Sequence, residues 1–518
     1  METREERALR IDRRAFLSRI FRPFDRLSAA IGPKKGDTTV FLCKCRGKTS
    51  INMEELATFV KRLRVKDVIL HNELCEIDGR AYFKSIATEN PGNILVATCT
   101  KKMTFNNIAT RLNYPVSFLY ILELRELCGW AHDDQKRATE KAKRIVASKL
   151  ASIHARALDK RDPSVALLAV SKALEPSDIR TLSGNMEGCP ADEKICSICG
   201  DFCPQKAVLY SEQGIRIDRR SCNVCGICAK TCPQNLMEVT PRYDTSLVLE
   251  LMLTDSHDIL RSKKREETLT AEIVAFVCEY KAKTSLIRLG LLKEKYPADI
   301  LPVFMRCLCD LTPNFILEAF GRGAEGVIMM GCDDCLYDSQ DYIGNLKSMM
   351  EGIFDGSILE GRLAIIRSDG KDSDKILETI NKFHIKIGQK KRMNVQYIEN
   401  AEKEKRHGFI DLLSVLQRQT DLKGTIKAHE MFPFGFVDVA TDSCDLCLQC
   451  AKICPFNALE AREKTLTFNH VKCTGCGLCV DACEKGLLDL KHEIRVKALA
   501  NGAMLIKDKS ESIENRET

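Results

Sequence analysis

The sequence contains no long hydrophobic run. No stretch of about 18 consecutive apolar residues occurs, so we expect no membrane-spanning helix. Charge of one sign is not concentrated either, because 79 lysines and arginines are interspersed with 72 acidic residues. This pattern favours solvated helix faces over a nucleic-acid-binding surface. We also find no Ser/His/Asp set and no paired carboxylates that would indicate bond-making chemistry in this chain.

Cysteine, in contrast, is abundant. The 518-residue chain contains 26 cysteines, although no two of them are adjacent. Many stand two or three residues apart, which is typical of metal ligation and not of a small disulfide scaffold. Because free thiols persist in reducing compartments, we predict a cytoplasmic, multidomain protein.

The first residues resemble an export signal. DRRAFLSRI at 12–20 contains twin arginines, but an export signal needs an apolar segment of about 7 to 15 residues next. That segment is interrupted by Arg22, Pro23 and Asp25. Apolar residues between 17 and 27 recur at helical spacing instead, which predicts a basic amphipathic helix. We expect it to dock on a partner or on the protein's own core, with weak membrane-surface contact as the alternative.

The cysteine positions indicate an internal duplication. Seven cysteines of a central set each have a counterpart 251 residues later. The central set is Cys196, Cys199, Cys203, Cys222, Cys225, Cys228 and Cys232; the later set is Cys447, Cys450, Cys454, Cys473, Cys476, Cys479 and Cys483. The later set begins with one further cysteine, Cys444, whose counterpart is Glu193. Chance does not produce such a register, so two copies of one module are predicted.

Each copy resembles a two-cluster [4Fe-4S] ferredoxin module of the bacterial type. In that family, three cysteines of one half-motif share a cluster with the last cysteine of the other half. The resemblance therefore implies four clusters. Their ligands would be Cys444, Cys447, Cys450 and Cys483; Cys473, Cys476, Cys479 and Cys454; Cys222, Cys225, Cys228 and Cys203; and Cys196, Cys199 and Cys232 with one ligand missing.

The missing ligand falls in the stretch EKICSICGDFCP at 193–204. Cys189 lies four residues before Glu193, and six residues separate it from Cys196. We predict that the Cys189 thiolate completes this cluster. The alternatives are a Glu193 carboxylate ligand or a three-iron cluster. A carboxylate oxygen is a harder donor than a thiolate, so that iron would be more labile.

Before the first module, strand-like runs alternate with helical stretches. The runs TTVFLCKC, VKDVILHNELC, GNILVATC and VSFLYILELRELC are separated by segments such as MEELATFVKRL, which predicts a parallel sheet. Its cysteines, Cys43, Cys45, Cys75, Cys99 and Cys128, follow or end these runs. Carboxyl ends of parallel strands meet at one edge, so these thiols are candidate ligands of a further [4Fe-4S] cluster. Each alone would instead be read as a small buried hydrophobe.

The segment 271–390 repeats this pattern. EIVAFVC, ILPVFMRCLC and EGVIMMGCDDC place Cys278, Cys307, Cys309, Cys332 and Cys335 at strand ends. The spacing suits a [2Fe-2S] centre or a zinc site. GRGAEG at 321–326 formally matches a dinucleotide fingerprint, but a helix-like run precedes it and a strand-like run follows, the reverse of the required order. We therefore reject it as a nucleotide site.

Both α/β segments resemble known families. Residues 37–157 resemble the N-terminal domain of the A subunit of heterodisulfide reductase, through VFLCKC, the Cys75 segment, VATCTKK and RELCGWAHDDQKRATEKAK. Residues 271–350 are similar to the delta subunit of methyl-viologen-reducing hydrogenase, a [2Fe-2S] protein that docks on that reductase, through FVCEY, MRCLCDLTPNFILEAF and GAEGVIMMGCDDCLY.

The sequence also departs from these families. The flavin domain of the reductase's A subunit has no counterpart, since a ferredoxin module stands in its place. Lys281 occupies the second position of the delta family's C-x2-C, the later pair Cys332 and Cys335 is spaced C-x2-C instead of C-x4-C, and Cys309 is a candidate replacement for the lost thiol. The Cys-Cys motif of the heterodisulfide-reducing subunit is absent from the sequence.

The expected fold class is α/β plus α+β, with two parallel-sheet domains alternating with two ferredoxin modules. We expect a basic extension at 1–36, a heterodisulfide-reductase-like α/β domain at 37–160, ferredoxin modules at 186–245 and 431–495, a delta-like domain at 271–390, linkers at 161–185, 246–270 and 391–430, and a tail at 496–518.

The resemblances imply an iron–sulfur electron-transfer subunit of a heterodisulfide-reductase-like complex. Its donor would be a hydrogenase, formate dehydrogenase or reduced ferredoxin, and its acceptor a catalytic, disulfide-reducing subunit. One alternative is a flavin-containing oxidoreductase; another is a zinc-bearing assembly scaffold whose ferredoxin modules alone are redox-active. Five cubanes and one [2Fe-2S] centre would give about 22 irons per chain.

Overall fold

We describe a computed structural model of the chain. The described residues are 37–89, 92–99, 102–114, 118–158, 181–184, 198–201, 203, 205–211, 214–218, 221–222, 227–232, 237–240, 245–253, 272–335, 339–393, 409, 412–413, 417, 425–427, 434–462, 465–495, 498 and 503–508. The predicted amphipathic extension lies outside them, as do Cys189, Glu193, Cys196 and Cys225.

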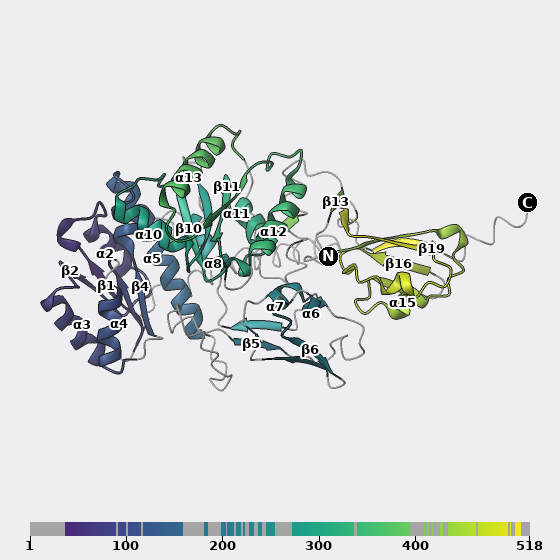
Figure 1. Cartoon of the computed structure of the whole chain (residues 1–518), viewed down its shortest axis with the longest axis horizontal. Coiled ribbons are helices and arrows are strands. Elements are labelled where there is room, and N and C mark those ends of the chain that lie inside the picture. The colour runs from purple at the N-terminus through teal and green to yellow at the C-terminus, as the bar shows by residue number, and fades with distance from the viewer. Residues whose placement is uncertain are drawn as a thin grey trace, which may run out of the picture.

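The first α/β domain is built on a four-stranded parallel sheet (Figure 1). Its elements are β1 (Thr39–Cys43), η1 (Cys45–Gly47), α2 (Met53–Lys61), β2 (Asp67–His71), α3 (Ile77–Glu89), β3 (Ile94–Ala97), α4 (Lys102–Arg111), β4 (Leu119–Leu122), the π-helical turn η3 (Arg125–Gly129) and α5 (Gln135–Leu158). The strand order is β2-β1-β3-β4. Side chains alternate along β1, so Val40 and Leu42 face α2 and α5, whereas Phe41 and Cys43 face α3 and α4.

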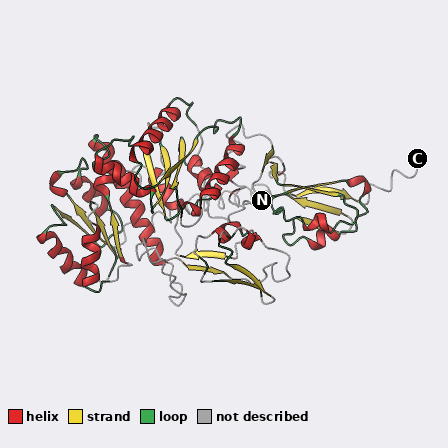
Figure 2. Cartoon of the chain, viewed as in Figure 1, coloured by secondary structure: helices red, strands yellow, loops and turns green. Residues whose placement is uncertain are grey.

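The second α/β domain has the same strand order, β10-β9-β11-β12, again all parallel. Its elements are β9 (Ile273–Cys278), α10 (Ala282–Leu292), β10 (Ile300–Met305), η6 (Leu308–Asp310), α11 (Pro313–Gly321), β11 (Gly326–Cys332), α12 (Ser339–Phe354), β12 (Leu363–Ser368) and α13 (Ser373–Gly388). Helices α10 and α13 lie on one side of the sheet, and α11 and α12 on the other (Figure 2). GRGAEG joins the end of α11 to the start of β11, so the predicted order of a helix followed by a strand is confirmed.

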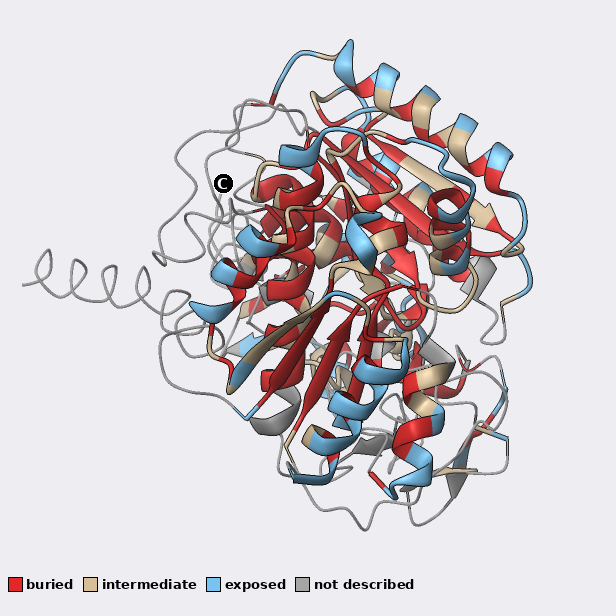
Figure 3. Cartoon of the chain, turned by 90° about the vertical axis from the view of Figure 1, so that its left-hand side faces the viewer, coloured by how far each residue is buried: buried red, intermediate tan, exposed pale blue. Residues whose placement is uncertain are grey.

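The two α/β domains share one continuous hydrophobic core. Helix α5 of the first domain packs against α8 (Thr245–Leu253), which in turn contacts β10 and α11 of the second. The backbones approach closely where α10 meets η3: a side chain added at Gly290 would place its Cβ 2.0 Å from the carbonyl oxygen of Glu126. Most strands of the two sheets are buried, whereas the edge strand β2 and the outer faces of the helices are more exposed to solvent (Figure 3).

Both ferredoxin modules are built from short antiparallel strand pairs and two short helices. The central module contains β5 (Thr181–Gly184), α6 (Ile198–Asp201), β6 (Val208–Ser211), β7 (Gly214–Ile217), α7 (Ile227–Thr231) and β8 (Met237–Thr240). The C-terminal module contains β14 (Phe436–Val439), η7 (Thr441–Ser443), α15 (Gln449–Ile453), β15 (Leu459–Arg462), β16 (Thr465–Asn469), α16 (Leu478–Asp481), β17 (Leu488–Lys491) and β18 (Glu493–Arg495).

Three strands lie in segments that the sequence had assigned to linkers or to the tail. β5 pairs with β8 of the central module. β13 (Thr425–Lys427) pairs with β18, and β19 (Ala503–Asp508) adds a third strand beside β16. Each module's sheet therefore uses residues beyond its cysteine motif. Within the described residues, no helix combines the length and the hydropathy needed to cross a bilayer.

Candidate iron–sulfur centres

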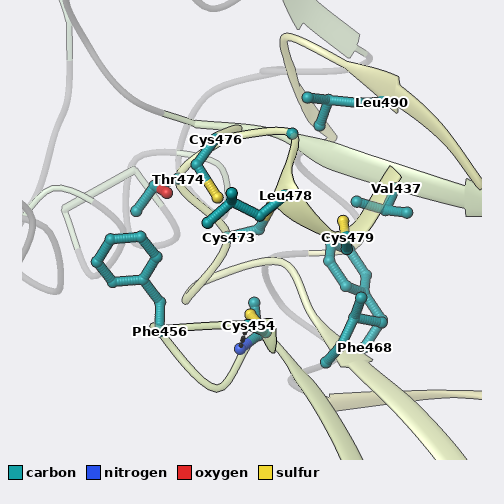
Figure 4. A pocket seen from close by; sticks show the side chains of 13 residues that line it. Val437, Cys454, Phe456, Phe468, Cys473, Thr474, Cys476, Leu478, Cys479 and Leu490 are labelled. Atoms are coloured by element: carbon teal, nitrogen blue, oxygen red, sulfur yellow. Dashed lines mark hydrogen bonds between the residues drawn. The ribbon is translucent and has the colours of Figure 1, made fainter. Parts of the chain in front are cut away.

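The C-terminal module places four cysteines around one cavity (Figure 4). Cys454, Cys473, Cys476 and Cys479 line it together with Phe456, Phe468 and Leu478. These are the four thiols that the ferredoxin resemblance assigned to one cluster. Burial raises the pKa of the Cys479 thiol to about 12, with the other three thiols adding to the effect.

The second set of this module is also gathered together. Burial raises the pKa of Cys450 to about 11, and Cys444, Cys447 and Cys483 lie close enough to raise it further. An array of buried neutral thiols is costly to ionise in one place unless a cation compensates the charge. This donor set therefore fits a cationic, thiophilic iron centre.

The backbone around these thiols also suits a cluster. Leu446 and Leu448, on either side of Cys447, have φ of 57° and 62°. Gly475 and Gly477 flank Cys476 in the same way, with φ of 74° and 82°. Left-handed residues are uncommon outside glycine. Backbone turns that use them direct successive N–H groups into a concavity that favours negative charge, as at many iron–sulfur sites.

One polar side chain inside the motif was not singled out from the sequence. Thr474 is 4% exposed, and its hydroxyl has no hydrogen-bond partner among the described residues. It lies beside Cys476, where it partly offsets the rise in the thiol's pKa that burial causes. A buried hydroxyl without a partner is costly, so Thr474 fits a site in which cluster or cysteine sulfur accepts its hydrogen bond. Its position between two cysteines that the resemblance assigned as ligands was the available sequence signal.

The described residues of the central module have the same local geometry. The amide of Ala207 donates to Cys203 Sγ at 3.2 Å, and 251 residues later Ala458 donates to Cys454 Sγ at the same distance. Cys199, Cys203, Cys222 and Cys228 pack in one small core. Cys232 is half-buried and its amide donates to the carbonyl of Cys228.

In the first α/β domain, three of the five thiols are in contact. Cys43 ends β1, and its Sγ lies 3.6 Å from Cys45 Sγ, which is also hydrogen-bonded to Cys99. The hydrogen bond that the Cys45 thiol donates lowers the pKa of Cys43 to about 6 and, together with the contact to Cys99, raises the pKa of Cys45. Cys75 is half-buried; it follows Leu74, whose amide donates to Cys43 Sγ at 3.5 Å.

Cys128 has other neighbours. It lies in η3 and is fully buried, and burial raises its pKa to about 12. Its charged and polar neighbours are Lys141 and Tyr296, whose groups meet at the boundary between the two α/β domains. The structure therefore brings Cys43, Cys45 and Cys99 together and places Cys128 in the packing between domains.

A cation stands beside the first thiol group. Burial lowers the pKa of the Arg125 guanidinium, but the ion pair with Glu126 at 2.7 Å outweighs this effect and raises it. Cys99 and Cys45 lie close enough to contribute to the rise. The guanidinium also stacks on Trp130, 3.8 Å from the ring centre. The sequence did not single out Arg125; its position just after the fourth strand, at the edge where the cysteines were expected, was the signal.

Four of the five thiols in the second α/β domain form two close pairs. Cys278 Sγ and Cys332 Sγ are 3.4 Å apart, and Cys307 Sγ and Cys335 Sγ are 3.9 Å apart. Two sulfurs on one tetrahedral metal with bonds of about 2.3 Å stand roughly 3.8 Å apart. Each pair therefore has the separation of two thiolates that share one metal. Within the described residues, no group of three or more His, Cys, Asp or Glu side chains has the geometry to hold one metal ion.

Cys309 and Lys281 adjoin these pairs. Cys309 is fully buried, and its amide donates to Cys307 Sγ at 3.5 Å. The thiols of Cys307 and Cys309 also help to raise the pKa of buried Tyr342, after burial itself. Lys281, which replaces the delta family's cysteine, forms an ion pair with Asp334, and its backbone amide donates to Cys332. The site therefore has a lysine at its rim where the resemblance implied a ligand.

The two sheets place their thiols in the same register. Cys43 and Cys278 each end the first strand. In the first domain Leu42 pairs with Ala97, so the residue opposite Cys43 is the one just before Cys99. In the second domain Val277 pairs with Met330, so the residue opposite Cys278 is the one just before Cys332. On the other neighbouring strand, Cys43 pairs with His71 and Cys278 pairs with Met305. Cys75 and Cys309 each come four residues after those partners. Three thiols thus occupy equivalent positions in both domains.

Comparison with known proteins agrees with this composite architecture. Residues 273–389 match the family described as methyl-viologen-reducing hydrogenase, delta subunit, and residues 443–496 match the 4Fe-4S dicluster domain. The chain is 29% identical over 118 residues to the A subunit of the ferredoxin/F(420)H(2)-dependent CoB-CoM heterodisulfide reductase of Methanosarcina acetivorans, which is 21% of this chain and 14% of that protein.

Two hydrogenase subunits are similar as well. The iron-sulfur D subunit of the F(420)-non-reducing hydrogenase vhc of Methanococcus voltae is 34% identical over 86 residues, 16% of this chain and 60% of that protein. The corresponding iron-sulfur D subunit of Archaeoglobus profundus is 28% identical over 119 residues, 22% of this chain and 87% of that protein. The chain combines similarity to a reductase A subunit, to hydrogenase iron–sulfur subunits and to a 4Fe-4S dicluster domain, and it spans only part of the reductase protein.

Proposed function

We propose that the chain is a multi-cluster iron–sulfur electron-transfer subunit of a heterodisulfide-reductase-like, hydrogenase-linked complex. The observation that carries this proposal is the cavity of the C-terminal module, where Cys454, Cys473, Cys476 and Cys479 surround one space in a region that matches the 4Fe-4S dicluster domain. When bound, the clusters would supply one-electron transfer. The chain's own residues supply thiolate ligands, apolar walls and hydrogen bonds to sulfur, which set the reduction potentials.

Strand register supports Cys189 as the fourth ligand of the incomplete central set. β5 pairs with β8 as β14 pairs with β17, and β8 lies 251 residues before β17. Cys189 is the fifth residue after Gly184, the end of β5, and Cys444 is the fifth residue after Val439, the end of β14. The central module thus has four extra residues between its first and second cysteines. By this count Cys189, and not Glu193, is the counterpart of Cys444.

In the first α/β domain we assign Cys43, Cys45, Cys75 and Cys99 as ligands of a [4Fe-4S] cluster. Three of these thiols are in contact and the fourth follows the residue that hydrogen-bonds to Cys43. Cys128 is the spare thiol, since its neighbours are Lys141 and Tyr296.

In the second α/β domain we assign a [2Fe-2S] centre. The pairs Cys278–Cys332 and Cys307–Cys335 give each iron two thiolates, as such a centre requires. Cys309 then lies behind Cys307 as the spare thiol, with its amide donating to that sulfur.

The partners follow from the relatives. We propose that a hydrogenase, formate dehydrogenase or reduced ferredoxin delivers electrons and that a disulfide-reducing subunit receives them, in the cytoplasm. Cys447 and Cys476 are the exposed cysteines among those described, which favours the C-terminal module for exchange with such partners. The ferredoxin modules would extend from about residue 181 to 245 and from about 425 to 508.

Metal and cofactor analysis of anaerobically purified protein tests the proposal. We expect about 22 irons with matching acid-labile sulfide, no flavin after acid precipitation, and no zinc. Stoichiometric flavin would favour a self-sufficient oxidoreductase, and stoichiometric zinc with about 16 irons would favour the scaffold. Cys189→Ala tests the fourth ligand of the central set: we expect loss of iron or conversion to a three-iron signal. Glu193→Gln is the matched control and should retain full iron.

A further inference from the structure

One side chain of the central ferredoxin module lies buried against the thiols of the second α/β domain. Ile227 stands between Cys225 and Cys228 in the sequence and begins α7. It is 2% exposed and packs with Cys307 and Cys309, which are 1% and 0% exposed.

The surroundings of this contact involve both cysteine sets. Helix α7 contacts η6, the turn that contains Cys309, and Cys335 lies at the edge of the same small apolar cluster. On the other side, Cys228 packs with Cys199 and Cys203 of its own module. In Figure 1, α6 and α7 lie on the side of the central module that faces the second α/β domain.

The duplication offers an internal comparison. The residue 251 positions after Ile227 is Leu478, which begins α16 in the same half-motif. Leu478 is only partly buried and lines the cavity of its own module. The burial of Ile227 is therefore not a property of the ferredoxin motif, since its counterpart lacks it. Ile227 is buried because the second α/β domain covers it.

We propose that this contact is an internal electron-transfer junction. It joins the cluster of Cys222, Cys225, Cys228 and Cys203 to the centre held by the thiols of the second α/β domain, and it rests on the proposed function. With both centres bound, one electron would leave the reduced centre on one side of Ile227 and the oxidised centre on the other side would gain it. No bond forms or breaks and no proton is required. Tunnelling rates fall steeply with distance, so ligands separated by one apolar side chain favour this step.

The test is the magnetic interaction between the two centres. In wild-type protein reduced with dithionite, we expect splitting or accelerated spin relaxation of the EPR signals from these centres. Ile227→Asp places a charge in the apolar contact and should abolish the interaction while iron content stays unchanged. Leu209→Asp, which places the same charge on the exposed face of β6 in the same module, should leave it intact. Ile227→Ser is a milder second variant if Ile227→Asp binds less iron.

A second readout requires no cluster signal. Amide exchange of a peptide covering Leu308–Asp310 should accelerate in Ile227→Asp and stay unchanged in Leu209→Asp. Retention of both the magnetic interaction and the slow exchange in Ile227→Asp would overturn the junction, as would equal loss in both variants. Wild-type protein with full iron but no interaction would overturn the junction alone. Wild-type protein without iron would overturn the proposed function itself.

Discussion

The guanidinium of Arg144 donates to the carboxylate of Glu272 at 2.7 Å, and both side chains are buried. Arg144 belongs to α5 of the first α/β domain, and Glu272 immediately precedes β9 of the second. The same guanidinium donates to the carbonyl of Met252 in α8, at 3.1 Å. One arginine therefore connects both domains and the helix between them. The relative position of the two thiol groups depends on this boundary.

Arg144→Met should destabilise the chain strongly. Removing one partner of a buried ion pair leaves the other charge uncompensated, which costs about 3–5 kcal/mol. The measurement is the free energy of unfolding in denaturant, followed by circular dichroism under anaerobic conditions. The control is Lys382→Met, which removes the exposed i,i+4 pair with Glu378; a surface pair of this kind contributes less than about 1 kcal/mol. Equal losses in the two variants would contradict the structural role of Arg144.

His132 should make stability depend on pH. Burial, with nearby Lys141, lowers the pKa of His132 to about 2. Its Nδ1 donates to the carbonyl of Tyr296 at 3.0 Å, and its Nε2 accepts from Lys141. The folded state keeps the ring neutral, whereas the unfolded chain binds a proton below about pH 6.5. Stability contributed by the neutral ring is therefore lost as pH falls below that value, by about 1.4 kcal/mol per unit.

His132→Gln tests this dependence. The amide does not titrate, so the variant should be less stable than wild type at pH 7 but should lose less stability between pH 6.5 and 5. Unfolding free energies at several pH values measure the two slopes. Identical slopes would show that His132 is not the group responsible.

Thr474→Val should lower the reduction potential of the neighbouring cluster. The buried hydroxyl beside Cys476 stabilises negative charge on sulfur, and reduction increases that charge. If the hydrogen bond is about 1 kcal/mol stronger in the reduced state, its loss shifts the potential down by roughly 40 mV. An EPR-monitored redox titration measures the shift. Thr467→Val is the control, because the Thr467 hydroxyl donates to the carbonyl of Glu460 on the strand pair β15–β16; an equal shift in both variants would exclude a specific effect.

Cys99→Ser and Cys128→Ser should distinguish a cluster ligand from a cysteine that only packs in the core of the first α/β domain. We expect Cys99→Ser to lose about four irons, the content of one cubane. Cys128→Ser should keep all of its iron, because the groups that act on the buried Cys128 thiol are Lys141 and Tyr296, at the boundary between the two α/β domains. Iron loss in Cys128→Ser and not in Cys99→Ser would reverse the assignment.

Much of this architecture could be predicted from the sequence, because cysteines stand at strand ends and their regular spacing reveals the duplicated module. The runs ending at Cys43, Cys278 and Cys332 are strands that end at those residues. The 251-residue register also reappears in three dimensions, in the hydrogen bonds of Ala207 and Ala458 to sulfur.

What could not be predicted depends on contacts between distant segments. β5 and β19 lie outside the cysteine motifs, and each joins its module only by pairing with a distant strand, β8 or β16. Cys128 follows a strand like its fellows, but the packing of Tyr296 from another domain decides its surroundings. Ile227 and Leu478 occupy the same motif position, and only the domain that covers the first distinguishes them.

The most direct measurement of the central claim is the iron and acid-labile sulfide content of the anaerobically purified chain, combined with EPR of the dithionite-reduced protein. The account predicts about 22 irons per chain, with signals from both [4Fe-4S] and [2Fe-2S] centres. About 18 irons would indicate that the first α/β domain holds no cluster, while electron transfer through the other centres would remain as proposed. Fewer than about eight irons, too few for even one complete ferredoxin module, would contradict an iron–sulfur electron-transfer function.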